Sequence, residues 1–175
     1  MANVYIFFGP PSSGKSYLGA IFAKKHNFVF YEADDDYLPE YRDRVKISEV
    51  EKQKVYNEFY TKVISRIKEL LKQGTSVVVA SALGKNSNRR RFFEELEATV
   101  TFILVKSETN ILTESAIKRE FPNLESKDIS SEEKESLNTH LLDKISKFEK
   151  PDFECTVIHN DYTDRSIEAL TNIKL

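Results

Sequence analysis

Residues 4–16 constrain the fold of this chain more than any other segment of its sequence. A continuous apolar run, VYIFF, is followed at once by GPPSSGKS, which matches the pattern G-x-x-x-x-G-K-[ST]. A short apolar run bounded by Gly and Pro predicts a strand buried on both faces, and residues 17–25 have helical spacing. The segment therefore predicts a strand, a tight loop and a helix in succession, which is a unit of parallel α/β sheets.

The loop in this segment has the chemistry of a phosphate cradle. Glycines let the backbone curl so that its N–H groups point at phosphate oxygens, and the following helix adds the positive end of its dipole. Lys15 would place a charge on the β- and γ-phosphates, and Ser16 offers a hydroxyl to Mg²⁺. Because Pro10 and Pro11 lack an N–H, the donors nearest the β-phosphate are expected from residues 13–16. We predict ATP and Mg²⁺ as cofactors, with nucleotide contacts from Gly9, Pro10, Pro11, Ser12, Ser13, Gly14, Lys15, Ser16 and Tyr17.

Further apolar runs extend this unit to a whole sheet. Runs at residues 28–31, 76–80, 100–105 and 155–158 alternate with segments of helical spacing, which is typical of a parallel sheet covered by helices. We predict an α/β fold: a three-layer P-loop NTPase with five parallel strands, helices on both faces and a short helical lid at about residues 107–130. With 175 residues and no visible linker, the chain is expected to form a single domain, residues 1–175.

Two long helices are expected at residues 48–73 and 131–150. Each starts at a serine followed three residues later by a glutamate, Ser48 with Glu51 and Ser130 with Glu133, and such pairs fit capping boxes. Gly74 fits the end of the first helix, and Pro151 follows the end of the second. Residues 120–130, the last part of the lid segment, are predicted to be a mobile polar excursion.

Composition excludes several classes of protein. Lys and Arg number 26 against 28 Asp and Glu, a net charge of -2, whereas general nucleic-acid binders carry a basic excess; a small-molecule partner is favoured. A single cysteine, Cys155, excludes an internal disulfide framework and a multi-cysteine zinc site, and the three histidines lack metal-ligand spacing. The longest apolar run falls short of the roughly 18 residues of a membrane span. We expect a cytoplasmic protein.

An acidic cluster, EADDD at residues 32–36, directly follows the second predicted strand. Because ligands of parallel sheets bind at the carboxyl ends of the strands, these carboxylates are expected to face the phosphate cradle. Carboxylates there suit two tasks, which are support of Mg²⁺ and acceptance of a proton from a hydroxyl that attacks the γ-phosphate. The residues alone leave open whether Asp34, Asp35 or Asp36 takes the second task.

Together, the cradle and the acidic cluster resemble the shikimate kinase and gluconate kinase group of small P-loop kinases, with gluconate kinases the closer match. Residues 30–40, FYEADDDYLPE, are similar to the gluconate kinase segment after strand two. SALGK at residues 81–85, with three arginines downstream, is similar to its Ser-Ala-Leu-Lys, and SKFE at 146–149 to its Ser-Gln-Phe-Glu. Residues 155–161 resemble its final strand and loop. The resemblance implies an ATP-dependent kinase with an alcohol group as acceptor, and suggests a homodimer.

The resemblance also implies roles for individual residues. Glu32 matches an acid that supports the Mg²⁺ shell, and Asp34 matches one that contacts the accepting hydroxyl. Lys118 and Arg119 lie near lid arginines of the family; we assign to Arg119 the neutralisation of charge in the transition state and leave Lys118 as the alternative.

The acceptor itself has further candidate contacts in the basic residues after the third strand. Arg89-Arg90-Arg91 spread over most of a helix turn, so they cannot all face one ligand. Arg89 and Lys85 are the candidates to pair with a carboxylate or phosphate of the acceptor.

Departures from the family patterns bear on the acceptor. Leu38 stands where gluconate kinases have histidine, the acidic run is one Asp longer, and residues 47–52 differ from a segment that helps to hold the sugar acid. The Gly-Gly-Gly turn of shikimate kinases is replaced by SAL at 81–83. A gluconate-like sugar acid is the first choice; alternatives are a nucleoside, nucleotide or shikimate-type kinase, a nucleotide-binding regulatory protein, and a kinase of RNA or DNA ends. The residues that contact adenine are not assigned.

Overall fold

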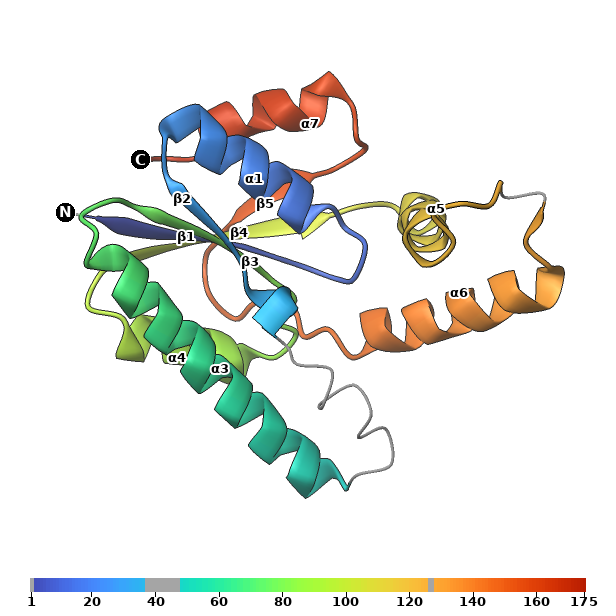
Figure 1. Ribbon diagram of the computed structural model, residues 1–175, viewed down its shortest axis with the longest axis horizontal. Helices are drawn as coiled ribbons and strands as arrows, with labels where there is room; N and C mark the ends of the chain where they lie inside the picture. The colour runs from blue at the N-terminus through green and yellow to red at the C-terminus, as the bar shows by residue number, and fades with distance from the viewer. Residues whose placement is uncertain (1, 37–47, 126–127) are drawn as a thin grey trace.

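A five-stranded parallel sheet forms the centre of the computed structural model, which describes residues 2–36, 48–125 and 128–175. The strands lie in the order β2-β3-β1-β4-β5 (Figure 1). Their bounds are Asn3–Phe8 (β1), Val29–Glu32 (β2), Val77–Ser81 (β3), Thr99–Lys106 (β4) and Thr156–His159 (β5). Each strand lies within one or two residues of an apolar run in the sequence, and the predicted five-stranded parallel sheet is confirmed.

The central strand β1 shows why the sheet is covered on both faces. Its side chains alternate, so that Tyr5 and Phe7 pack in one apolar cluster and Val4, Ile6 and Phe8 in another. The first cluster includes residues of α1 (Lys15–His26), and the second includes residues of α3 (Glu49–Leu71) and α4 (Asn86–Glu95). Because β1 is buried at every position from Val4 to Phe8, it requires a helical layer on each side.

Shorter elements complete the two layers. A 3₁₀ turn, η1 (Ala33–Asp36), follows β2, and α7 (Asp164–Glu168) with η3 (Ala169–Asn172) lies beside α1. Figure 1 shows α1 and α7 on one side of the sheet and α3 and α4 on the other. The predicted three-layer arrangement is therefore confirmed.

Two helices project beyond the carboxyl end of β4 (Figure 1): α5 (Thr109–Glu120) and α6 (Ser131–Ser146). They pack on each other around Leu112, Ala116 and Leu141, an apolar cluster separate from the two on the sheet. The capping boxes predicted for α3 and α6 are both present. Of the two, α5 lies within the segment predicted as a lid, about residues 107–130, and α6 begins directly after it.

The end of α6 differs from the sequence prediction of residue 150. The helix ends at Ser146, with Lys147 as its C-cap. Beyond it the backbone N–H of Glu149 donates to the Gly84 carbonyl at 2.8 Å, and Lys150 precedes a proline, which disfavours helical backbone there. Phe148 is therefore not on the helix but turns toward the sheet, where its ring lies 6.2 Å from that of Phe8.

None of the helices among the described residues is both long and apolar enough to cross a membrane.

Candidate active site

The loop after β1 is a tight turn built from two prolines and two serines. The Ser13 N–H donates to the Pro10 carbonyl at 3.3 Å, and Ser12 between them has a φ of 63°. Proline at the second position and a left-handed residue at the third are the pattern of a type II turn, in which the third position is ordinarily glycine. The prolines therefore fix the shape of the loop, and the same bond shows that the Ser13 N–H, expected to face phosphate, has an internal acceptor here.

Beyond the turn, the loop runs into the first turn of α1. Gly14, with a φ of 85°, is the N-cap of that helix, and Lys15 and Ser16 are its first residues. The N–H groups of a first helical turn have no acceptor within the helix, and they collect the positive end of the helix dipole. Lys15 is 7% exposed. The loop thus offers free N–H donors and a largely buried ammonium side chain in one place.

Three side chains from the carboxyl ends of β4 and β5 hold the outer side of the loop. Asn160 Nδ2 donates to the Ser13 carbonyl at 2.9 Å, and the Ser107 hydroxyl lies 3.2 Å from the same oxygen. The Tyr162 phenol donates to the Ser12 carbonyl at 3.2 Å. These hydrogen bonds therefore fix the peptide groups to which the Ser12 and Ser13 carbonyls belong. We call Ser107, Asn160 and Tyr162 the bracket.

The bracket makes glycine necessary at position 14. A Cβ there would lie 2.0 Å from Asn160 Nδ2 and 3.1 Å from the Tyr162 hydroxyl, in a backbone conformation that L side chains rarely adopt. We expect Gly14→Ala to lower the free energy of unfolding by more than the roughly 1–2 kcal/mol of left-handed backbone alone, and to weaken ATP binding at least tenfold. Thermal denaturation and nucleotide titration measure the two effects.

Gly74→Ala is the matched control for this variant. Gly74 has a similar φ of 79°, but a Cβ there would meet nothing within 4 Å. Gly74→Ala should lower the free energy of unfolding only by the cost of left-handed backbone, without a steric clash of the new Cβ. It should leave ATP affinity unchanged. Equal losses of stability in the two variants would contradict the role assigned to the bracket.

Asp34 faces the cradle from the neighbouring sheet edge. Its Oδ1 accepts from the Ser81 hydroxyl at 3.1 Å and from the Ala82 N–H at 3.3 Å, both at the end of β3. Its Oδ2 lies 4.0 Å from Lys15 Nζ. One oxygen is thus anchored and the other is turned to Lys15, which is predicted to bind phosphate, while the neighbouring Asp35 is exposed. Asp36 is the end of η1, and the placement of its side chain is not described.

Glu32, the last residue of β2, reaches the start of α1. Partial burial raises the pKa of its carboxyl; the nearby carboxylate of Asp34 acts in the same direction, and a hydrogen bond with the Ser16 side chain opposes them. Its Oε1 is buried and has no hydrogen-bond partner among the described residues. A half-buried carboxylate with an unused oxygen beside a serine hydroxyl has the oxygen chemistry that Mg²⁺ prefers.

Arg89 lies on α4 with no exposed surface. Its guanidinium carbon is 4.9 Å from the centre of the Phe8 ring and 4.8 Å from that of Phe148, and its nitrogens donate to the Leu83 carbonyl and to the Asn86 side chain. In the part of the chain that the structure describes, the buried Nη2 has no hydrogen-bond partner, and burial lowers the pKa of the guanidinium. A guanidinium between two rings at the end of β1 thus retains an unused donor.

The remaining basic candidates are more exposed. Lys85 is the N-cap of α4, and Lys118 and Arg119 lie in the last turn of α5; all three are exposed. Within the described ranges, neither Lys118 nor Arg119 forms an ion pair. The other two arginines of the triplet form ion pairs within the protein, Arg90 with Asp152 and Arg91 with Glu95. Leu38 and the rest of residues 37–47 lie outside the described residues.

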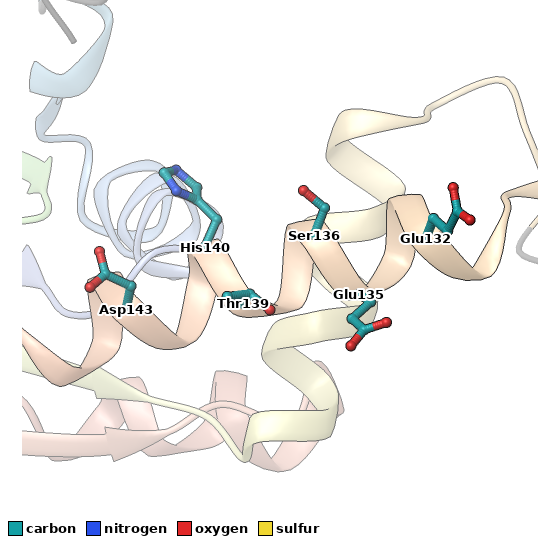
Figure 2. A pocket seen from close by; sticks show the side chains of 6 residues that line it. All are labelled: Glu132, Glu135, Ser136, Thr139, His140 and Asp143. Carbon is teal, nitrogen blue, oxygen red and sulfur yellow. The ribbon is translucent and has the colours of Figure 1, made fainter. Parts of the chain in front are cut away.

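A wide, open hollow of about 550 Å³ runs along α6. Figure 2 shows its lining side chains, all from this one helix: Glu132, Glu135, Ser136, Thr139, His140 and Asp143. None of the predicted site residues lines it. Across the described part of the chain, no group of three or more His, Cys, Asp or Glu side chains is arranged to hold a metal ion.

Sequence reasoning found the cradle and the acids but missed the bracket as a structural unit. Asn160 and Tyr162 follow the last strand, β5, and the sequence indicates no partner for either of them. They hold carbonyls 147 and 150 residues earlier in the chain, and no local pattern reports such a contact. The one local signal is turn chemistry, since Asn and Asp directly after a buried strand favour a tight loop.

The loop after β1 has the residues of a phosphate cradle, and the carboxylates of Glu32 and Asp34, at and just after the end of β2, lie close to it. Together with the strand order β2-β3-β1-β4-β5, this arrangement is that of a P-loop kinase. The chain belongs to the shikimate kinase family, which it matches over residues 11–158. It is therefore a small-molecule kinase of the P-loop type, and the family uses ATP.

Solved structures of such kinases share the fold. A gluconokinase from Sinorhizobium meliloti 1021 has a TM-score of 0.64 at 18% identity, with 97% of this chain and 92% of that chain covered. APS kinase of Mycobacterium tuberculosis, in complex with AMPPNP and APS, has a TM-score of 0.62 at 13% identity, covering 98% and 94%. Shikimate kinase of Acinetobacter baumannii, in complex with shikimate, has 0.55 at 13%, covering 98% and 90%. No curated protein sequence matches the chain.

Proposed function

We propose that this protein transfers the γ-phosphate of ATP to a hydroxyl of a small metabolite, with a gluconate-like sugar acid as the first acceptor to test. The observation that carries the proposal is the approach of Asp34 Oδ2 to Lys15 Nζ at 4.0 Å. The lysine belongs to the cradle and the aspartate to the neighbouring sheet edge. A hydroxyl that contacted Asp34 would therefore lie next to the terminal phosphate.

Each residue then has one task in the transfer. The acceptor oxygen forms a bond to the γ-phosphorus as the bond from that phosphorus to the β,γ-bridging oxygen breaks, and ADP leaves. Asp34 Oδ2 accepts the hydroxyl proton, while Ser81 and Ala82 keep its other oxygen in place. Lys15 and the N–H groups of the first turn of α1 stabilise the charge on the transferred group.

The residues beside the cradle fit a magnesium ion. Ser16 and Glu32 would hold it, since the buried Oε1 of Glu32 has no partner and Ser16 is bonded to the same carboxyl. When bound, Mg²⁺ would neutralise charge on the β- and γ-phosphates. Asp34 would add negative potential to the same place, since its carboxylate acts, after burial, in the direction that raises the pKa of Glu32.

Glu32 predicts a change of stability with pH. A carboxyl whose pKa is raised by folding stabilises the folded state below its ordinary pKa of 4.5, and loses that contribution as pH rises through the folded value. At pH 7 ionised Glu32 therefore destabilises the unliganded protein. We expect Glu32→Gln to raise Tm by a few degrees at pH 7, with 1 kcal/mol worth about 2–4 °C in a chain of this size, and by less at pH 4.

The same variant should lose the stabilisation that Mg²⁺ adds to ATP. Differential scanning calorimetry with ATP, with and without Mg²⁺, measures both effects. A lower Tm for Glu32→Gln at pH 7 would contradict the account of its burial. An unchanged Mg²⁺ effect would remove Glu32 from the metal site.

For the acceptor, we propose that Arg89 and Lys85 contact an acidic group. The support is the unused Nη2 of Arg89 and the lowered pKa of its guanidinium; a nearby anion would offset the desolvation of a buried cation. We further propose that residues 1–175 are one kinase domain, and that about residues 107–130, which include α5, form a lid whose cation, Arg119 or Lys118, approaches the transferred phosphate.

An acceptor screen tests the proposed function. ADP release is measured with MgATP and gluconate, other sugar acids, shikimate, sugars, nucleosides, nucleotides and oligonucleotides, with Lys15→Ala as the control for contaminating kinases. Stimulation by a sugar acid that vanishes in Lys15→Ala supports the proposal. Preference for a nucleoside, or ATP binding with no stimulation by any acceptor, would replace it with one of the alternatives.

A further inference from the structure

The side chain of Tyr162 joins the phosphate cradle to helix α5. Its phenol lies 3.2 Å from the Ser12 carbonyl and 3.1 Å from the Ser115 hydroxyl on α5. Because a carbonyl only accepts, the phenol proton goes to Ser12, and the Ser115 hydroxyl donates to Tyr162. Two hydrogen bonds therefore lead from α5, through one phenol, to the loop that would hold the phosphates.

The position of Tyr162 is fixed by its surroundings. Its φ of 60° is uncommon for a bulky residue and persists only where neighbouring contacts impose it. Its N–H donates to Asn160 Oδ1 at 3.1 Å, and the Nδ2 of the same side chain holds the Ser13 carbonyl. The rings of Tyr17 and Tyr162 lie 5.7 Å apart. The phenol is therefore held beside the cradle by backbone and ring contacts together.

Packing on the other side of the cradle is incomplete. The α5–α6 pair has its own apolar cluster, which includes Leu112 and Leu141. A cavity of about 210 Å³ lies between the cradle and this pair, lined by Pro10, Leu112 and Phe148 among others. Because side chains do not fill this space, apolar packing connects the cradle to α5 only in part. The hydrogen bonds of Tyr162 connect them more directly than this packing does.

The peptide group between Ser12 and Ser13 can couple phosphate binding to the hydrogen bonds of Tyr162. The Ser12 carbonyl, which Tyr162 holds, and the Ser13 N–H belong to one peptide group. In this structure that N–H makes a long bond of 3.3 Å to Pro10. A phosphate oxygen that accepted from it would polarise the peptide group, and linked hydrogen bonds strengthen one another. The bonds from Tyr162 to Ser12 and from Ser115 to Tyr162 would then tighten together.

Resting on the kinase function proposed above, we propose that Tyr162 is a positioning residue that couples phosphate binding in the cradle to the position of the α5 lid helix. It contacts no reacting atom. It acts through Ser12 on one side and Ser115 on the other, so that an occupied cradle holds α5 more firmly than an empty one.

Hydrogen exchange tests the coupling, with inorganic tripolyphosphate as the probe because it fills a phosphate cradle without a nucleoside. In the wild-type protein, tripolyphosphate should slow amide exchange across residues 109–120. In Tyr162→Phe the probe should still bind, within about fivefold, the equivalent of one ordinary hydrogen bond. The slowing in α5 should fall at least fivefold, and kcat should fall more than the KM for ATP changes.

Two further variants separate coupling from a general loss of stability. Ser115→Ala breaks only the lid end of the link, so it should reproduce the loss of slowing in α5, and the double variant should be no worse than either single one. Tyr5→Phe is the matched control, because it removes a phenol bonded to Asn3 at the opposite end of β1. It should leave the slowing and kcat unchanged even where Tm falls.

The results distinguish this inference from the proposed function. Full slowing of α5 in Tyr162→Phe, additive losses in the double variant, or no slowing in the wild-type protein despite binding would overturn the coupling alone. Failure of the wild-type protein to bind both tripolyphosphate and ATP would overturn the kinase proposal, and the coupling with it.

Discussion

Lys15→Ala is expected to reduce phosphoryl transfer at least about 10³-fold, because the removal of one preorganised donor to developing charge in an enclosed site already costs about 10²–10³-fold. Lys15 is 7% exposed and lies at the start of α1, where the dipole and the free N–H groups converge. Its charge is therefore screened less than that of a surface lysine. The loss should appear in kcat for every acceptor that the wild-type protein phosphorylates.

Lys24→Ala is the control on the same helix. Lys24 is exposed in the last turn of α1, so its removal should leave kcat within about twofold, as expected for surface substitutions away from special features. Circular dichroism confirms that both variants fold. Substantial activity in Lys15→Ala would show that the cradle does not bind the transferred phosphate.

Asp34→Asn is expected to lower kcat about 10²–10⁴-fold, the range attributed to a positioned general acid or base. The variant keeps an oxygen for Ser81 and Ala82, which hold Oδ1 at 3.1 and 3.3 Å, so Tm should change little. It loses the negative charge that faces Lys15 and accepts the proton. A steady-state assay with saturating ATP and acceptor isolates this step.

Asp35→Asn tells the two adjacent acids apart. Asp35 is exposed, whereas one oxygen of Asp34 is anchored to the end of β3 and the other lies 4.0 Å from Lys15. We expect Asp35→Asn to retain most activity. If it lost more activity than Asp34→Asn, the proton acceptor would be Asp35. The hydrogen bonds that hold Asp34 would then serve only to stabilise the fold.

The sheet was predictable because its signal is local. Each strand is a run of apolar side chains short enough to be bounded by Gly, Pro or polar residues, and burial on both faces of β1 follows from its composition. Both capping boxes were readable for the same reason, since Ser48 and Glu51 are three residues apart. Contacts within one turn involve residues that are close in sequence, so a sequence pattern can predict them.

Contacts across the fold were not predictable in this way. The end of α6 was placed four residues too late because Phe148 continues the helical stripe, whereas its ring packs with Phe8 and Arg89. Three adjacent aspartates look equivalent in a sequence, whereas in the fold Asp34 is distinguished by its hydrogen bonds from Ser81 and Ala82 and its approach to Lys15. Likewise, the burial of Arg89 between two rings comes from strands and loops that meet only in the folded chain.

The bracket also sets when the cradle can form during synthesis. The loop at residues 9–16 is among the first parts of the chain to be made, but Asn160 and Tyr162, which hold its carbonyls, come 147 and 150 residues later. A nascent chain that has completed β1 and α1 therefore lacks the side chains that shape the loop for phosphate. The ability to bind ATP tightly should arise late in translation, so incomplete chains would neither sequester nor consume the nucleotide.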